Sequence, residues 1–136
     1  RHPLWSRGLG DVYKRQARDD KEARNDWVLR GFRQFDAPVA VIVTFDSSLK
    51  DDDISKFDCG AVVNGLVNAG WSRGLGAVIN SQGIMQSPVV RKYANIPDDE
   101  TIMICVAMGY PDFSFPANKV VSKRRPVSEV VNFKGF

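Results

Sequence analysis

Two nearly continuous apolar runs constrain this chain more than any other feature of its sequence. Val39 to Phe45 reads VAVIVTF and Thr101 to Met108 reads TIMICVAM, and the first is rich in β-branched residues. An alternating strand keeps one face in water, whereas an unbroken apolar strand is buried on both faces. The two runs therefore predict buried strands, and the first is expected to be a central one.

Two segments are predicted to form short helices. Residues 17–31 are charged and carry apolar side chains at roughly helical spacing, and Gly31 is expected to close this helix. Ser87-Pro88 is a favourable capping pair, which predicts a helix through Tyr93. With 136 residues, the chain is long enough for these elements to share one core.

The longest predicted helix has glycine at three interior positions. It is expected to begin at a cap provided by Asp53 or Ser55 and to run to about Ser72. The glycines are Gly60, Gly65 and Gly70. Each costs roughly 1 kcal/mol relative to alanine in a helix interior, so the missing side chains are expected to provide a gain. Close packing against another helix or a flat ligand is one explanation, and simple tolerance is the alternative.

A glycine-rich turn follows this helix. Gly74-Leu75-Gly76 leads into a short predicted strand, Ala77 to Ile79, and then into a polar loop from Asn80 to Gly83. Residues 112–136, beyond the second buried strand, contain prolines and basic residues and end near a strand-like VVNF piece. This last segment is expected to be an arm rather than part of the core.

Composition excludes several classes of function. The one histidine, His2, lies near the N-terminus, which argues against Ser-His-Asp chemistry and against a site with several histidine ligands, so we expect no metal and no catalytic side chain. Catalysis would then need a cofactor. The net charge of +3 is small and its charges are scattered, and no zinc-knuckle spacing is present, so nucleic acid is not an expected partner. The longest apolar runs are too short to cross a bilayer, so no membrane association is expected.

The two cysteines, Cys59 and Cys105, lie far apart in apolar surroundings. This pattern predicts buried, inert thiols and a reducing compartment, of which the cytoplasm is the simplest. One basic cluster is tight and consists of Lys119, Lys123, Arg124 and Arg125. It is interpreted either as a solvated surface or as a binding site for a phosphate.

The first sixteen residues, RHPLWSRGLGDVYKRQ, show neither strand alternation nor a helical stripe. Their ending resembles a run that recurs at the ends of unrelated translated environmental sequences. Residues 1–16 are therefore interpreted as a tail or an assembly scar, and residues 17–136 as the domain.

Several spaced motifs then resemble one family, the FMN-dependent nitroreductases. Residues 32–39 (FRQFDAPV) look like its approach to a central strand, and residues 58–60 (DCG) with the GLG turn at 74–76 look like its glycine-bearing helix. Further matches are IPDD at 96–99, GYP at 109–111 and SKRRP at 122–126. The last two are the most specific pair, and the resemblance covers about residues 30–136.

The resemblance implies an α+β fold, a nitroreductase-like sandwich with a central β-sheet flanked by helices, truncated at its N-terminus. It also implies a homodimer that binds two FMN molecules at the subunit interface and takes reducing equivalents from NADH or NADPH. The electron acceptor would be a small molecule such as a nitroaromatic or a quinone, reduced in a ping-pong cycle. The glycine-bearing helix would then pack at the dimer core.

The resemblance also implies a set of FMN-binding residues. After the GLG turn the family's backbone meets the N5 and O4 edge of the flavin, which assigns this role to Ile79, Asn80, Ser81, Gln82 and Gly83. Arg124 matches the arginine that binds the FMN phosphate, and Ser122 is expected to add a hydrogen bond. Lys123 and Arg125 are expected to face solvent.

Two departures from the family pattern matter. Ile79 stands where a proline is common, and the family's N-terminal FMN-binding motifs have no match before Arg30. The chain is therefore expected to be a C-terminal portion with an incomplete flavin site. The alternatives are a non-enzymatic fragment that self-associates or binds anions, and a family member with another substrate, such as a dehalogenase, an enoate-type reductase or a flavin-fragmenting enzyme.

Overall fold

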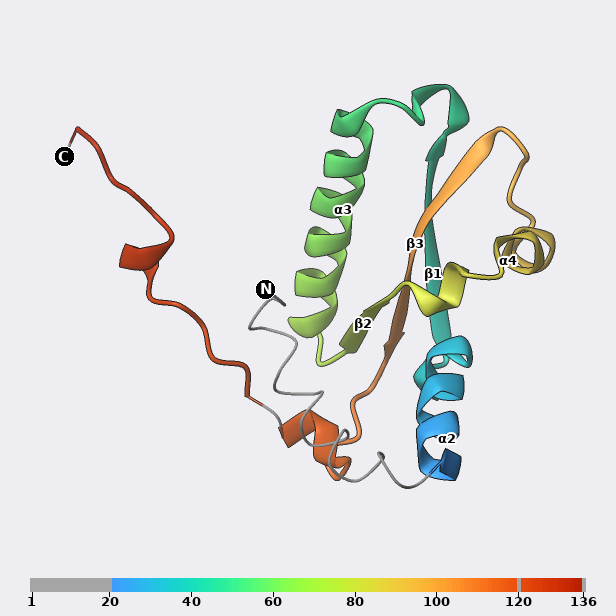
Figure 1. The fold of residues 1–136 in the computed structure, drawn as a ribbon, viewed down its shortest axis with the longest axis horizontal. Helices are drawn as coiled ribbons and strands as arrows, with labels where there is room; N and C mark the ends of the chain where they lie inside the picture. The colour runs from blue at the N-terminus through green and yellow to red at the C-terminus, as the bar shows by residue number, and fades with distance from the viewer. Residues whose placement is uncertain (1–20, 120, 136) are drawn as a thin grey trace. The chain divides into compact units, whose positions relative to one another are not determined.

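The computed structural model describes residues 21–119 and 121–135, so the predicted tail, residues 1–16, lies outside the described residues. The chain divides into two compact units. Glu22–Pro111 forms one, which holds the sheet and its helices (Figure 1), and the segment from Asp112 onward belongs to the other.

Three antiparallel strands form the sheet. They are β1 (Val39–Asp46), β2 (Gly76–Asn80) and β3 (Glu100–Gly109), in the order β1-β3-β2. Both apolar runs are strands, as predicted, but the expectation that Val39 to Phe45 is central is wrong for the described strands, because β1 pairs only with β3. An apolar run indicates which faces of a strand are covered and does not report how its edges are paired.

Helix α3 (Asp53–Trp71) packs on one face of the sheet, and Figure 1 shows it running along that side with α2 and α4 on the other. Val63 of α3 meets Val106 and Met108 of β3 in the apolar core. The predicted caps, Asp53 and Ser55, are both wrong. Asp52 is the cap, because its extended backbone lets its carboxylate accept hydrogen bonds from the Ile54 and Ser55 N–H groups at 3.1 and 3.3 Å.

The three glycines of α3 lie in two different environments. A Cβ on Gly70 would lie 2.6 Å from Cε of Met108, so Gly70 makes room for a strand residue rather than for the helix or flat ligand predicted. A Cβ on Gly60 or on Gly65 would meet nothing within 4 Å. Of these three glycines, only Gly70 therefore has a packing reason within this chain to be glycine.

Helices α2 (Lys21–Phe32) and α4 (Ser87–Ala94) are shorter. Gly31 was expected to close the first, but it lies inside α2 and is buried. Gln86 rather than Ser87 precedes the first turn of α4, and left-handed Asn95 ends that helix. Both differences are shifts of one or two residues at a helix end, where local sequence signals are weakest.

The second unit is described from Asp112 to Lys119 and over residues 121–135. It contains two short turns of 3-10 helix, η5 (Pro116–Lys119) and η6 (Val127–Glu129), and residues 121–135 are all exposed. The predicted VVNF strand is wrong, since residues 130–133 are not part of a strand. Because residues 121–135 are exposed and contain no strand, they have the character of the predicted arm.

Candidate functional site

The loop assigned to the flavin by resemblance, residues 79–83, lies where β2 ends. Among the described strands β2 pairs only with β3, so the backbone N–H and C=O groups along its other edge are free to meet a ligand. Ile79 is 57% exposed and Ser81 is exposed, whereas Asn80 and Gly83 are buried. The loop therefore has an outer side open to a ligand and an inner side fixed to the protein.

Asn80 anchors the inner side. Its side chain donates from Nδ2 to the Gly31 carbonyl oxygen at 2.7 Å and to Gln34 Oε1 at 2.9 Å. Asn80 is only 4% exposed, and a buried amide without partners would be costly. Its side-chain Nδ2 is therefore not available to a flavin, because both of its hydrogen bonds are made within the chain.

Gln34 connects Asn80 to two further segments. Its Nε2 donates to the Gly83 carbonyl oxygen at 3.4 Å, and its Oε1 also accepts from Sγ of Cys105 at 3.1 Å. Burial raises the pKa of the Cys105 thiol, which keeps the thiol protonated and able to donate. One carboxamide, on the segment that follows α2, thus bonds to the loop after β2 and to the central strand β3.

Two glycines complete this contact. A Cβ on Gly83 would collide with the Gln34 carboxamide, and a Cβ on Gly31 would collide with the carboxamide of Gln82. Gln82 in turn donates to the Val28 carbonyl oxygen at 3.4 Å. We call Gly31, Gln34, Gln82 and Gly83 the glutamine interlock, since each glutamine on one segment sits against a glycine on the other.

The backbone at Gln34 is unusual. Gln34, Phe35 and Asp36 all have left-handed φ values, between 56° and 57°. This conformation costs a non-glycine residue roughly 1 to 2 kcal/mol. Arg33 braces the turn from outside by donating to Asp36 at 3.2 Å and to Asp26 at 3.3 Å.

Ser122 and Arg124, predicted to bind the phosphate, belong to the other unit. Both are exposed, as are Lys123 and Arg125 beside them. Ile79 to Gly83 lie together at one edge of the sheet in the first unit, whereas Ser122 and Arg124 lie in the second. The four exposed side chains supply cationic and hydroxyl donors, which is the chemistry that a phosphate requires.

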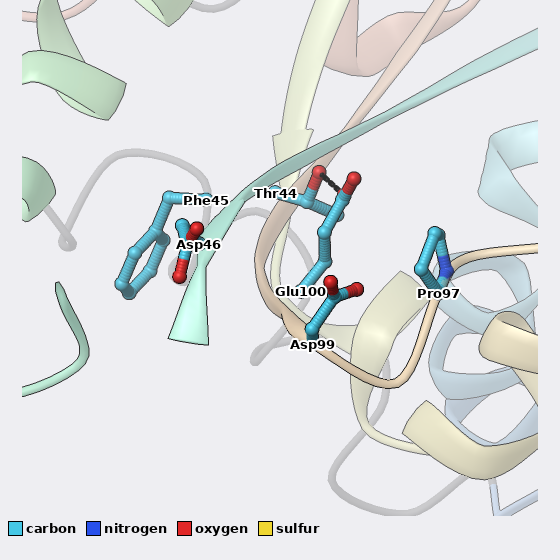
Figure 2. A pocket seen from close by; sticks show the side chains of 6 residues that line it. All are labelled: Thr44, Phe45, Asp46, Pro97, Asp99 and Glu100. Carbon is cyan, nitrogen blue, oxygen red and sulfur yellow. Dashed lines mark hydrogen bonds between the residues drawn. The ribbon is translucent and has the colours of Figure 1, made fainter. Parts of the chain in front are cut away.

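A separate hollow of about 380 Å³ lies at the far end of β1. Its lining residues are Thr44, Phe45, Asp46, Pro97, Asp99 and Glu100. Figure 2 shows the Thr44 hydroxyl and the Glu100 carboxylate turned toward each other, joined by a hydrogen bond that Thr44 donates. Its three carboxylates would repel a phosphate, so this hollow does not suit FMN.

The described residues contain no group of three or more His, Cys, Asp or Glu side chains that could hold a metal ion. Within the same part of the chain, no helix has the length and apolar character needed to span a membrane. Cys59 and Cys105 are both free and buried, which confirms the predicted burial of these thiols.

Comparison with known proteins identifies the family. The sequence model of the nitroreductase family matches residues 5–110. The chain belongs to this family. The nitroreductase fold is also supported by the crystal structure of an FMN and NADPH-dependent nitroreductase, NfnB, from Sphigopyxis sp. strain HMH, with a TM-score of 0.84 and 26% identity. That comparison covers all of this chain and 62% of the solved one.

Two nitroreductases of known substrate are also similar. A chloronitrobenzene nitroreductase from Comamonas testosteroni is 32% identical, and a nitrobenzene nitroreductase from Ectopseudomonas oleovorans is 33% identical, each over 92% of this chain. The chain spans about half the length of these relatives, 54% of each. The predicted fold class, an α+β nitroreductase sandwich with a sheet flanked by helices, is confirmed.

Gln34 was missed as a site residue by sequence reasoning. It lies within the FRQFDAPV motif that supported the resemblance, but no feature of that motif indicated contact with residues 80–83. The one available signal was a polar residue shortly before the proline that precedes β1.

Proposed function

We propose that this chain belongs to an FMN-dependent NAD(P)H oxidoreductase that reduces small nitroaromatic or quinone acceptors in a ping-pong cycle. The proposal is supported by family membership and by the activities for which the similar nitrobenzene and chloronitrobenzene nitroreductases are named. The observation that carries it is the position of residues 79–83 at the open edge of β2.

The flavin ring edge needs hydrogen-bonding groups, and residues 79–83 can offer them from their backbone. The inner side of this loop is held by Asn80 and Gly83, so its outer side is a fixed surface rather than a mobile one. Ile79 adds an exposed apolar side chain beside the same edge. These residues fit the polar rim of an isoalloxazine.

The FMN phosphate needs cationic donors. Arg124 would hold it through its planar guanidinium, and Ser122 would donate a hydroxyl hydrogen bond. Both side chains are exposed. Lys123 and Arg125 would add a favourable local field without direct contact.

When bound, FMN supplies hydride acceptance from NAD(P)H and hydride donation to the acceptor at its N5 position. The residues of this chain bind and orient. Residues 79–83 would meet the ring edge through backbone groups, and Arg124 would bind the phosphate. We assign no side chain as a general acid or base.

The proposal is tested by FMN titration of the chain and of two arginine variants. Arg124→Ala should weaken FMN binding roughly ten- to a hundredfold, because a charge-assisted contact to a phosphate is worth roughly 1.5 to 3 kcal/mol. Riboflavin lacks the phosphate and should be nearly indifferent to the substitution. Arg125→Ala is the matched control and should barely change either ligand.

Equal losses for the two arginine variants would show a general charge effect and would contradict the phosphate assignment. A colourless protein that takes up neither flavin would contradict the proposed function and favour a non-enzymatic, self-associating or anion-binding role.

We further propose a homodimer in the cytoplasm. The outer side of α3 exposes large apolar side chains, including Phe57 at 76%, Trp71 at 64% and Val62 at 63%. Gly60 and Gly65 lie on this exposed helix with open space above them, which would let a second helix approach closely. Sedimentation should show a dimer at micromolar concentration, and a stable monomer would contradict this part of the proposal.

A further inference from the structure

We propose that Gln34 is a positioning residue, which sets the place of residues 80–83 so that their backbone can meet a flavin ring. The inference rests on the proposed function, because it assigns the reason for the contact to the flavin. It concerns a residue outside the loop, on the segment between α2 and β1.

The polar contacts of Gln34 are directed at this loop. Its Oε1 accepts from Asn80 at 2.9 Å, and its Nε2 donates to the Gly83 carbonyl oxygen at 3.4 Å. These two bonds hold the first and the last residue of the 80–83 segment. Because hydrogen bonds fix distance and direction, two of them on one planar amide fix the position of the segment.

Steric contacts also restrict the position of the loop. Gly83 has no Cβ where the Gln34 carboxamide lies, and Gly31 has none where the Gln82 carboxamide lies. A displacement of the loop would therefore have to break these hydrogen bonds or shift the carboxamides that lie against the two glycines. The glutamine interlock thus restricts the position of the loop.

The backbone conformation supports the same conclusion. Three consecutive left-handed residues, Gln34 to Asp36, are costly for side chains of this type. This turn is what lets Gln34 reach the inner side of the loop and lets the chain enter β1 at Val39. Strain of this kind persists only where surrounding contacts over-determine it, and the interlock provides such contacts.

A loss of the interlock should affect the two ends of the cofactor differently. Residues 80–83 would address the ring, which FMN and riboflavin share, whereas Arg124 would address the phosphate, which riboflavin lacks. A shift of the loop should therefore weaken both flavins by the same factor. This equal loss separates a positioning role for Gln34 from a contribution to phosphate binding.

The experiment compares the full chain with Gln34→Ala. Without any flavin, amide hydrogen exchange is followed at Ile84 and Met85, whose N–H groups bond to the carbonyls of Ser81 and Gln82. Exchange at these two sites should accelerate about tenfold in the variant. The dissociation constants of FMN and of riboflavin should each rise about tenfold, so that their ratio stays constant.

Gln86→Ala is the matched control. It makes the same truncation at an exposed glutamine that makes no capping hydrogen bond from its side chain, and it should change neither exchange nor binding. Gly83→Ala is a second variant, which keeps Gln34 but displaces its carboxamide. It should reproduce the loss, and it should add nothing in the Gln34→Ala background, where the truncated side chain leaves room for the new methyl group.

Three results would overturn the proposal: unchanged exchange in Gln34→Ala, faster exchange with unchanged affinity for both flavins, or additive effects of the two substitutions. If the unsubstituted chain binds neither flavin, the proposed function fails and with it the flavin role of Gln34. The exchange data then show separately whether the interlock holds the loop.

Discussion

Both faces of β3 are buried, yet different contacts hold them. On one face Val106 and Met108 pack against Val63 of α3, and the contact is apolar throughout. On the other face Cys105 meets the carboxamide of Gln34 through a hydrogen bond. Cys105 and Val106 are neighbours in sequence, and both are 0% exposed.

Two equally buried residues can therefore have different roles, one in stabilising the sheet and one in positioning a loop. Apolar burial is non-directional and roughly proportional to area, so the α3 face stabilises the sheet without dictating the position of any one backbone group. Hydrogen bonds depend on distance and angle, so the Gln34 face fixes the loop after β2. The following substitutions test whether stability and positioning separate in this way.

The largest effect is expected from Val106→Asp. A carboxylate without a partner in the apolar core should lower the free energy of unfolding by about 4 kcal/mol or more. Val78→Asp is the matched control on β2, where the side chain is 42% exposed, and it should cost about 1 kcal/mol or less. Urea denaturation measures both, and similar losses would contradict the contrast between core and edge.

A smaller effect is expected on the opposite face. Cys105→Ala removes the donor to Gln34 and a buried sulfur, and should cost about 1 to 2 kcal/mol of unfolding free energy. Cys105→Ser keeps a donor and should cost less. A serine variant less stable than the alanine variant in urea denaturation would show that burying a hydroxyl here costs more than its hydrogen bond to Gln34 contributes.

The two sides of α3 should respond differently to alanine. Gly60→Ala meets open space and should raise the monomer's unfolding free energy by about 0.5 to 1 kcal/mol through helix propensity. Gly70→Ala should lose this gain, because the new Cβ would crowd Met108. Thermal unfolding at low protein concentration compares them, and equal gains would contradict the packing role of Gly70.

The smallest effect concerns pH. Burial raises the pKa of the Cys105 thiol, so the stability linked to this group is present below the ordinary thiol pKa and is lost as pH rises through the raised value. From neutral pH to about pH 10, the unsubstituted chain should lose more stability than Cys105→Ala. Parallel curves in urea denaturation across this range would show that the thiol titrates as it does in water.

Much of the fold could be predicted from local patterns. The apolar runs predicted β1 and β3 to within one residue at each end, and Gly74 was correctly placed in the turn after α3, where its φ is +78°. The pairing order was not predictable, because a strand's own residues do not encode its neighbours. Gly31 was misplaced for a related reason, since its role is to make room for Gln82, 51 positions further along the chain.

The candidate site was only partly predictable. Resemblance assigned residues 79–83 to the flavin, which stays a prediction, and it did not indicate that the Asn80 side chain is bonded inward. Gln34 could not be identified from the sequence, because its partners Asn80 and Gly83 are 46 and 49 positions away. Left-handed backbone at a glutamine and a phenylalanine also has no strong local signal, since glycine, asparagine and aspartate are the residues that favour it. The assignments of Ser122 and Arg124 remain predictions.

The contacts of Gln34 also have a kinetic consequence. The bond from Cys105 closes a separation of 71 positions along the chain, and the bond from Asn80 closes one of 46. Contacts between such distant residues have a loop-closure entropy cost. We therefore expect directional bonds of this kind to form after the strands have paired. We expect substitutions at Gln34 to leave the folding rate nearly unchanged and to speed unfolding, so that the lifetime of the native state depends on this one carboxamide.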